Sequence, residues 1–336
     1  MEMEKVKLGI IGAGIVVQDL YYQELKQIQN RFEVVAIASG DQESADACRK
    51  LFQAKRTYLD YRQLLADKEV EAVCVAYPFT MNHEIVCAAL DAGKHVMVEK
   101  PIATSLEDAR EMVKKAADSE LVCLLAENFR YRRFYAKVRE LLEEGAIGKV
   151  STFIWNLISF TPRTLKYVSK STWRLNSHYG LLFDGSVHFI SGFREMFGEI
   201  KSAVGAAHQM REDMGTNDMV TYQMLFESGV TGTYHMFQSS VGYANNDAVI
   251  FGSKGTMKLE GLRKMIVSTD EETYTVELEG EDEGYMAEFL DYYDCIQNHK
   301  TPKSSFEQGY RDFLADVVAF APLERWDALR LEEFDK

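Results

Sequence analysis

The chain has 336 residues, of which 46% are hydrophobic and 27% charged, and its formal net charge is −14. This length suffices for two domains, and the negative charge disfavours nucleic acid and anionic membranes as partners. The sequence has no apolar run of about twenty residues, and its acidic start is unlike a signal peptide. We therefore expect a cytoplasmic protein without membrane or nucleic-acid partners, whose five scattered cysteines are reduced.

The first expected element is a buried strand over residues 7–11, which leads directly into Gly12-Ala13-Gly14. Gly12 can adopt the backbone angles of a tight turn, and Gly14 has no side chain to obstruct a pyrophosphate. The phosphate would lie at the N-terminus of a helix that begins at Ile15 and Val16. Val17 occupies the third position of the G-x-G-x-x-G fingerprint and departs from the small residue expected there. The segment predicts a dinucleotide-binding turn.

Short apolar strands alternate with amphipathic helices in the N-terminal part of the chain. We expect strands over residues 7–11, 32–38, 72–76, 95–98 and 121–126, and helices over residues 44–52, 83–92 and 106–117. This alternation is typical of a doubly wound parallel sheet, whose ligands bind at the carboxyl ends of the strands. Gly12, Ser39, Tyr77 and Glu99 stand at those ends.

The end of the second strand bears on the choice between NAD and NADP. An acidic residue there would bind the ribose 2′-hydroxyl of NAD, but Ser39 and Gly40 occupy the position. A small hydroxyl beside a glycine leaves room for a 2′-phosphate. Asp41 and Glu43 follow, however, and no arginine is adjacent. The pattern favours NADP over NAD.

Lys100 follows Glu99 at the carboxyl end of a buried strand, and Pro101 fixes the backbone after it and admits a cis peptide bond. A lysine in this position points toward the cofactor crevice. The alternative is that Lys100 only caps the strand and pairs with Glu99.

The pattern changes after Ala126. We expect helices over residues 134–144, 181–197, 285–298 and 305–320, and alternating strands over residues 220–226, 230–237, 248–251 and 256–259. Closely spaced alternating segments joined through glycine are typical of an antiparallel sheet. We predict an α/β chain with two domains. Residues 1–126 form an NAD(P)-binding Rossmann domain, and residues 127–336 form an α+β domain with an open, mostly antiparallel sheet for substrate binding and oligomerisation.

Several motifs in this order resemble the Gfo/Idh/MocA oxidoreductases. They are Gly12-Ala13-Gly14, Glu99-Lys100-Pro101, Gly145-Ala146-Ile147-Gly148-Lys149-Val150, Trp173-Arg174 and the segment from Gly180 to His188. The resemblance covers nearly the whole chain. It implies an NAD(P)-dependent dehydrogenase or reductase, which moves a hydride between a nicotinamide cofactor and a secondary alcohol or ketone of a sugar, polyol or related compound. The alternative is a non-catalytic NAD(P)-sensing regulatory protein on the same fold.

The resemblance also implies site residues. The implied catalytic residues are Lys100, Asp184 and His188. The implied cofactor-binding residues are Gly12, Gly14, Ile15, Val16, Ser39, Gly40, Tyr77, Pro78, His83, Glu99, Lys100, Asn128, Trp173 and Arg174. The implied substrate-binding residues are Lys100, Arg130, Asp184, His188 and Tyr285, although Arg130 could equally form an ion pair between the domains. His178 and Tyr179 replace part of a glycine run and reshape the pocket. A homodimer or homotetramer through the exposed sheet face is implied as well.

Asp184 and His188 stand four residues apart on an expected helix, so both can reach one substrate hydroxyl. Oxidation of an alcohol needs a base for the hydroxyl proton, and the pKa of histidine lies near neutrality. Asp184 can orient the ring or bind a neighbouring hydroxyl, while Lys100 binds the reacting oxygen. Whether Lys100 or His188 is the base stays open. The structural alternative is that Asp184 and His188 only form a pair satisfied by local hydrogen bonds. We predict no metal, because no third histidine or cysteine stands at ligand spacing.

Overall fold

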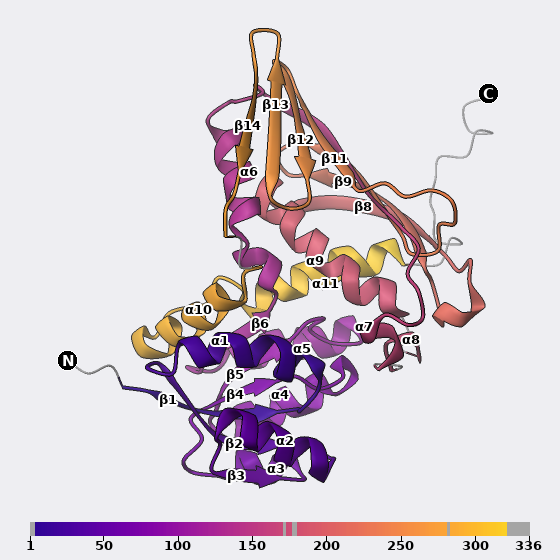
Figure 1. The fold of residues 1–336 in the computed structure, drawn as a ribbon. Helices are drawn as coiled ribbons and strands as arrows, with labels where there is room; N and C mark the ends of the chain where they lie inside the picture. The colour runs from indigo at the N-terminus through magenta and orange to yellow at the C-terminus, as the bar shows by residue number, and fades with distance from the viewer. Residues whose placement is uncertain (1–3, 171–172, 177–179, 281–282, 321–336) are drawn as a thin grey trace. The chain divides into compact units, whose positions relative to one another are not determined.

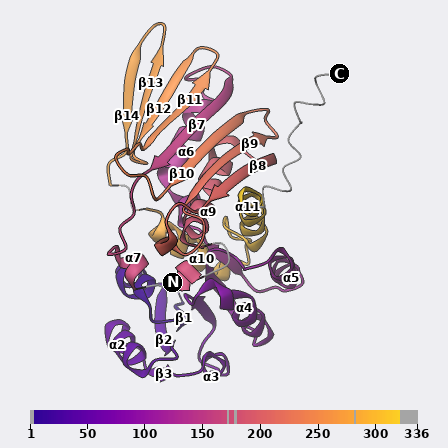
Figure 2. The ribbon, with the colours of Figure 1, turned by 90° about the vertical axis from the view of Figure 1, so that its right-hand side faces the viewer.

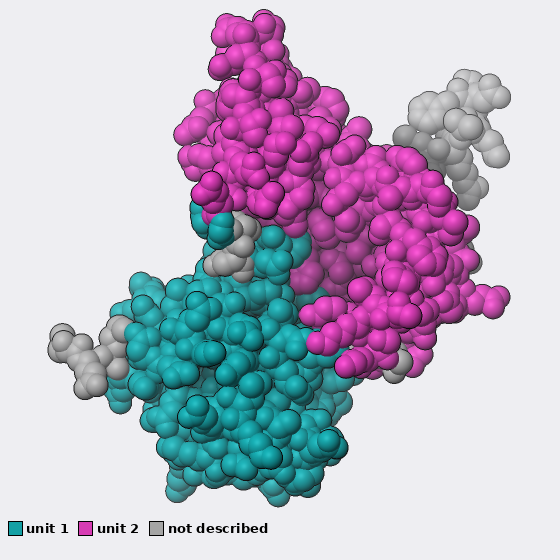
Figure 3. All heavy atoms as spheres, viewed as in Figure 1, with its two compact units in different colours: residues 1–133, 280–313 teal, residues 134–279, 314–336 magenta. Residues whose placement is uncertain are grey.

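The computed structural model describes residues 4–170, 173–176, 180–280 and 283–320. Figure 3 colours the two compact units into which the chain divides. Unit 1 comprises Met1–Arg133 and Gly280–Phe313, and unit 2 comprises Phe134–Glu279 and Leu314–Lys336. The division differs from the single boundary after Ala126 that the sequence analysis predicts, because the chain returns to unit 1 at Gly280.

Unit 1 is built around a parallel sheet, which has six strands among the described residues, in the order β3-β2-β1-β4-β5-β6. The strands are β1 (Val6–Ile11), β2 (Phe32–Ala38), β3 (Arg56–Tyr58), β4 (Ala72–Val75), β5 (His95–Glu99) and β6 (Cys123–Ala126). In this order the direction of winding reverses between β1 and β4, which is the switch point where such folds bind dinucleotides. The structure confirms the predicted Rossmann sheet.

The helices of unit 1 form two groups that each pack together. One group contains η1 (Val16–Tyr21), α1 (Tyr22–Gln27), α2 (Gln42–Phe52) and α10 (Tyr285–Asn298), and the other contains α3 (Tyr61–Leu65), α4 (Asn82–Asp91) and α5 (Leu106–Ala117). Two short 3-10 helices, η2 (Phe79–Met81) and η3 (Asn128–Tyr131), follow β4 and β6. Because crossovers are right-handed and winding reverses at the switch point, the two groups cover opposite faces of the sheet. Figure 1 labels the helices, and Figure 2 shows α2 on one side of the strands and α4 and α5 on the other.

An aromatic cluster explains why α10 belongs to unit 1. Phe289 lies edge-on to Tyr21 with ring centroids 5.0 Å apart, and Tyr293 lies edge-on to Phe32 at 5.6 Å. Phe289 and Tyr292 are fully buried in the core that also contains β1 and β2. Burial of such rings contributes several kcal/mol, about 1.5–3 for each large side chain, so the helix is an integral part of the nucleotide fold.

Unit 2 contains an open sheet with eight strands among the described residues, in the order β14-β13-β12-β11-β7-β10-β9-β8. The strands are β7 (Val150–Ile158), β8 (Ile200–His208), β9 (Met219–Phe226), β10 (Thr231–Phe237), β11 (Asp247–Gly252), β12 (Gly255–Glu260), β13 (Lys264–Thr269) and β14 (Thr273–Glu277). Its neighbouring strands are antiparallel except β7 and β10. This confirms the predicted open, mostly antiparallel sheet.

One face of the unit 2 sheet is covered by helix α9 (Gly180–Phe197), as Figure 2 shows. Phe153 of β7 stacks on Phe197 with ring centroids 4.6 Å apart and lies 5.1 Å from Phe193. The next residue along the strand, Ile154, points to the opposite face and is 41% exposed. The remaining helices of this unit are α6 (Arg133–Glu143), α7 (Lys166–Ser169), α8 (Trp173–Asn176) and η4 (Glu212–Met214), and α11 (Phe306–Ala319) begins in unit 1 and ends in unit 2.

Candidate active site

The turn after β1 has the geometry that a dinucleotide phosphate requires. Gly12 has a φ of +118°, and a Cβ atom there would overlap the backbone carbonyl of Ala76 at the end of β4. At Gly14 a Cβ atom would meet nothing within 4 Å, so the backbone before the helix is open to a ligand. Val17 is fully buried in the core of unit 1 and does not occupy this approach. Ile15 and Val16 are half-buried beside it.

The end of β2 brings Ser39, Gly40 and Tyr77 together. The Gly40 amide donates to the Tyr77 hydroxyl over 3.3 Å, and the Asp41 amide lies 3.4 Å from the Ser39 hydroxyl. The carboxylate of Asp41 is turned to α2, where it caps the helix by accepting a hydrogen bond from the Ser44 amide at 2.8 Å. The hydrogen bonds from Ser44 lower the pKa of Asp41 from its ordinary value. The nearest carboxylate is therefore engaged by the protein itself.

Lys100 lies at the carboxyl end of β5, and the Lys100–Pro101 peptide bond is cis. Asn82, which is fully buried at the start of α4, donates to the carbonyl oxygens of Glu99 at 2.8 Å and Pro101 at 2.9 Å. These two bonds bracket Lys100 and fix its backbone. The sequence analysis missed Asn82, because an asparagine just before an expected helix looks like an ordinary cap.

Beneath this turn lies a buried acidic group. Tyr21 donates to Glu99 over 2.7 Å, and Glu288 of α10 is fully buried nearby, with its charge acting on Tyr21. Neither carboxylate oxygen of Glu288 has a hydrogen-bond partner among the described residues. Burial, followed by the charges of Glu99, Glu127 and Asp291, raises the pKa of Glu288 well above its ordinary value. At pH values between the pKa of Glu288 in the unfolded chain and its raised pKa in the folded protein, the folded protein therefore keeps a proton on Glu288 that the unfolded chain releases.

We expect the variant Glu288→Gln to remove one pH dependence of stability, because glutamine resembles the protonated acid. In the wild type, the raised pKa of Glu288 in the folded protein stabilises the fold fully at pH values below the pKa of the unfolded chain. This stabilisation is lost as the pH rises toward the pKa of the folded protein. The free energy of unfolding of the wild type should then fall relative to the variant by up to about 1.4 kcal/mol per pH unit. Urea titrations at several pH values measure this difference, and curves that stay parallel across the range would refute it.

Other predicted residues of unit 1 lie near the end of β6 and on α10. Asn128 is buried and donates to the Glu283 carbonyl at 2.8 Å. Arg130 forms an ion pair with Asp312 at 2.5 Å, and both side chains are buried. The ion pair lies within unit 1 and not between the predicted domains. Tyr285 is half-buried at the first position of α10.

In unit 2, Asp184 and His188 lie on α9 one turn apart, as predicted. Asp184 is buried and His188 is half-buried. The Arg174 guanidinium donates to Asp184 over 2.8 Å and lies over the Trp173 ring at 4.4 Å from its centroid. The sequence analysis assigned Arg174 to the cofactor and did not foresee this pair, which joins residues of two helices. His178 and Tyr179 lie outside the described residues.

The comparisons with known proteins agree with these features. The family described as "Oxidoreductase family, NAD-binding Rossmann fold" matches residues 6–147, and the Gfo/Idh/MocA C-terminal domain matches residues 135–258. A solved oxidoreductase from Thermotoga maritima is 30% identical, with a TM-score of 0.88 over 95% of this chain and 96% of its own. The chain belongs to the Gfo/Idh/MocA oxidoreductase family. It is thus an NAD(P)-dependent oxidoreductase acting on CH–OH groups, and the alternative of a non-catalytic sensor is not favoured.

Two further relatives have names that state an activity or a ligand. Myo-inositol 2-dehydrogenase of Thermotoga maritima is 25% identical and aligns over 98% of this chain and 99% of its own length. A levoglucosan dehydrogenase structure, in complex with NADH and L-sorbose, has a TM-score of 0.81 at 22% identity, over 95% of this chain and 96% of its own. The second likeness shows the fold alone.

The turn at Gly12 and Gly14 fits the nicotinamide cofactor that the family uses. Gly12 lets the turn pass close to the Ala76 carbonyl, and the open space beside Gly14 leaves room for a pyrophosphate. None of the helices formed by the described residues has the length and apolar character needed to cross a membrane.

Proposed function

We propose that this oxidoreductase acts on a secondary alcohol, or the corresponding ketone, of a sugar or polyol, with Lys100, Asp184 and His188 as its catalytic residues. The observation that carries the proposal is the position of Lys100, held by Asn82 at the carboxyl edge of the dinucleotide sheet. Relatives named as inositol and sugar dehydrogenases support the substrate class. Residues 1–126 would serve the cofactor, and residues 127–336 the substrate and assembly.

In the proposed chemistry, His188 and Lys100 act on the reacting group, and Asp184, held by Arg174, assists them. The bound nicotinamide supplies the hydride acceptor or donor. In the oxidative direction the carbinol C–H bond breaks, and the hydroxyl proton passes to His188 as the carbonyl forms. Lys100 donates a hydrogen bond to the reacting oxygen. Arg174 fixes the carboxylate of Asp184, which then accepts a hydrogen bond from a second substrate hydroxyl or from the His188 ring.

A substrate screen tests this function. The purified protein is incubated with NAD⁺ or NADP⁺ and a panel of polyols, inositols and sugars, and reduced cofactor is followed by absorbance. We expect reduced cofactor with at least one member of the panel and no reaction with simple primary alcohols. Binding of cofactor without turnover of any alcohol or ketone would contradict the proposal.

NADP is the cofactor that we propose, on the support of the Ser39 hydroxyl, the exposed Gly40 backbone and the engagement of Asp41 as a helix cap. Quenching of tryptophan fluorescence by NADPH and NADH measures the preference. We expect tighter binding of NADPH, reversed in Ser39→Asp, which adds a carboxylate for a ribose hydroxyl. Ser39→Ala is the matched control, and tighter binding of NADH by the wild type would overturn the proposal.

Location and assembly belong to the same proposal. Five free thiols, four of them buried, suit a reducing compartment such as the cytoplasm. On the outer face of the unit 2 sheet, Ile154 and Val204 lie in one row across the strands and are 41% and 40% exposed. A second copy covering this face would give a homodimer or homotetramer. A monomeric mass in light scattering would contradict it.

A further inference from the structure

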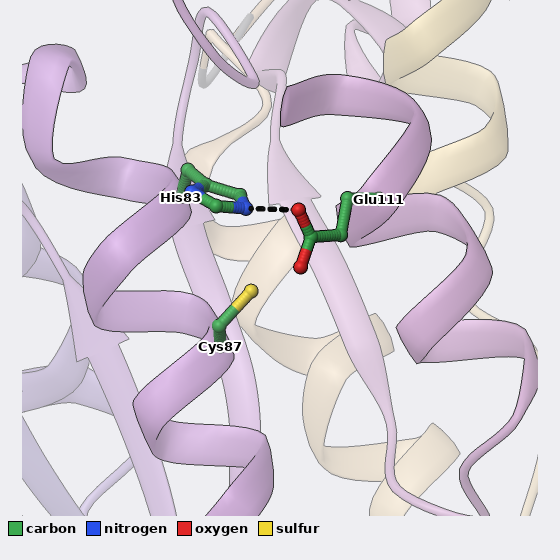
Figure 4. Close-up of side chains that lie close together, drawn as sticks. All are labelled: His83, Cys87 and Glu111. Atoms are coloured by element: carbon green, nitrogen blue, oxygen red, sulfur yellow. Dashed lines mark ion pairs between the residues drawn. The ribbon is translucent and has the colours of Figure 1, made fainter. Parts of the chain in front are cut away.

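A cluster of potential metal ligands lies between α4 and α5 of unit 1 (Figure 4). His83 and Cys87 are one turn apart on α4, so their side chains share a face of the helix. Glu111 faces them from α5. One ligand atom from each of the three residues lies within 4.8 Å of the other two. Packing of the two helices thus brings an imidazole, a thiol and a carboxylate close together.

The His83 ring lies between two carboxylates. Its Nε2 atom is 3.0 Å from Oε2 of Glu111, and its Nδ1 atom is 3.8 Å from Oδ1 of Asp108. Nε2 is buried without a hydrogen bond of good geometry among the described residues. A simple ion pair between His83 and Glu111 would give the imidazole ring a polar partner, but it would not involve the neighbouring Cys87 sulfur.

The Cys87 sulfur points into the space between the His83 ring and the Glu111 carboxylate (Figure 4). Cys87 is half-buried, and burial raises the pKa of its thiol from the ordinary value. A bound cation would reverse that effect, because a coordinating thiol is deprotonated by the metal. Binding would therefore release a proton and strengthen as pH rises.

We propose that His83, Cys87 and Glu111 form a zinc site, with water in the fourth position. Imidazole, thiolate and carboxylate are the ligands that Zn²⁺ prefers, and three protein ligands with one open position suit its tetrahedral geometry. Mg²⁺ and Ca²⁺ require oxygen ligands and do not fit this set. The proposal departs from the sequence-based prediction of no metal, because spacing along the chain does not reveal that Glu111 approaches α4.

The site is placed to influence the turn that holds Lys100. Asn82, whose side chain binds the carbonyl oxygens of Glu99 and Pro101, directly precedes His83 on α4. A metal bound through His83 and Cys87 would fix the first turn of that helix. Zinc would then act as a structural or inhibitory ligand and not as part of the hydride-transfer chemistry.

Cobalt substitution tests the site in the whole protein. Co²⁺ bound to a thiolate gives a charge-transfer band in the near ultraviolet, and tetrahedral Co²⁺ gives intense visible bands. We expect one equivalent of Co²⁺ to produce both bands, and Zn²⁺ to remove them by competition. The charge-transfer band should disappear in Cys87→Ser, although the other four cysteines remain.

Affinity measurements with a chromophoric chelator complete the test. Zn²⁺ should bind Glu111→Gln and His83→Asn at least about tenfold more weakly than the wild type, since even loss of an outer-shell partner costs about 10–100-fold. Glu107→Gln is the matched control, because Glu107 is an exposed acid on the same helix. Circular dichroism checks that each variant is folded. Absence of the thiolate band, or its persistence in Cys87→Ser, would overturn the proposal and leave an ordinary ion pair between α4 and α5.

Discussion

Replacement of Lys100 by methionine, or of His188 by alanine, lowers kcat by about 10²- to 10⁴-fold in our expectation, because we propose that each of these groups handles the proton or the reacting oxygen. Methionine keeps the length and apolar stem of lysine but cannot donate a hydrogen bond. Since Lys100 is half-buried and bracketed by the bonds of Asn82, the variant should keep the turn and the fold. Steady-state kinetics with the substrate found in the screen measures the effect.

Two controls separate lost chemistry from lost binding. Titration of tryptophan fluorescence should show that both variants still bind the reduced cofactor, because both keep the glycines of the turn proposed to bind the pyrophosphate. Lys115→Met is the matched control, since Lys115 near the C-terminal end of α5 forms an ion pair with Asp91, the last residue of α4, 2.6 Å apart. Its kcat should not change. Unchanged turnover in both Lys100→Met and His188→Ala would remove the proposed mechanism.

The sheet of unit 1 could be predicted because its strands are buried on both faces and read as continuous apolar runs. The expected strand over residues 32–38 and the helix over residues 106–117 coincide with β2 and α5. Strand β3 and helix α3 were missed because each is short and carries polar residues such as Arg56 and Arg62. Local pattern contains little information about a three-residue edge strand.

The partners of the candidate site residues could not be predicted, since they depend on contacts between segments far apart in the chain. The pair of Arg174 with Asp184 and the two bonds of Asn82 are set by packing. The cap formed by Asp41 is local, because Ser44 is only three residues away. The packing of α10 into unit 1 is reflected in the spacing of its aromatic residues. Phe289, Tyr292 and Tyr293 recur at helical spacing, which indicates a helix with a deeply buried aromatic face.

The variant Arg130→Met tests whether Arg130, a predicted substrate-binding residue, instead stabilises the fold. Arg130→Met removes the ion-pair partner of Asp312, whose carboxylate is fully buried on α11. Loss of one member of a buried pair typically costs about 3–5 kcal/mol. We expect the free energy of unfolding, measured in urea, to fall by about that amount, and cofactor affinity to fall with it near the unfolding transition.

The variants around Arg130 decide between the two roles. Arg133→Met is the matched control, because Arg133 is exposed and its replacement should change stability by less than about 0.5 kcal/mol. The double variant Arg130→Met/Asp312→Asn should regain part of the loss, since it removes the carboxylate that the first change leaves buried. If Arg130→Met instead raised KM for the substrate with stability unchanged, Arg130 would be a substrate ligand, because a guanidinium that contributes only to substrate binding has no partner in the fold to destabilise.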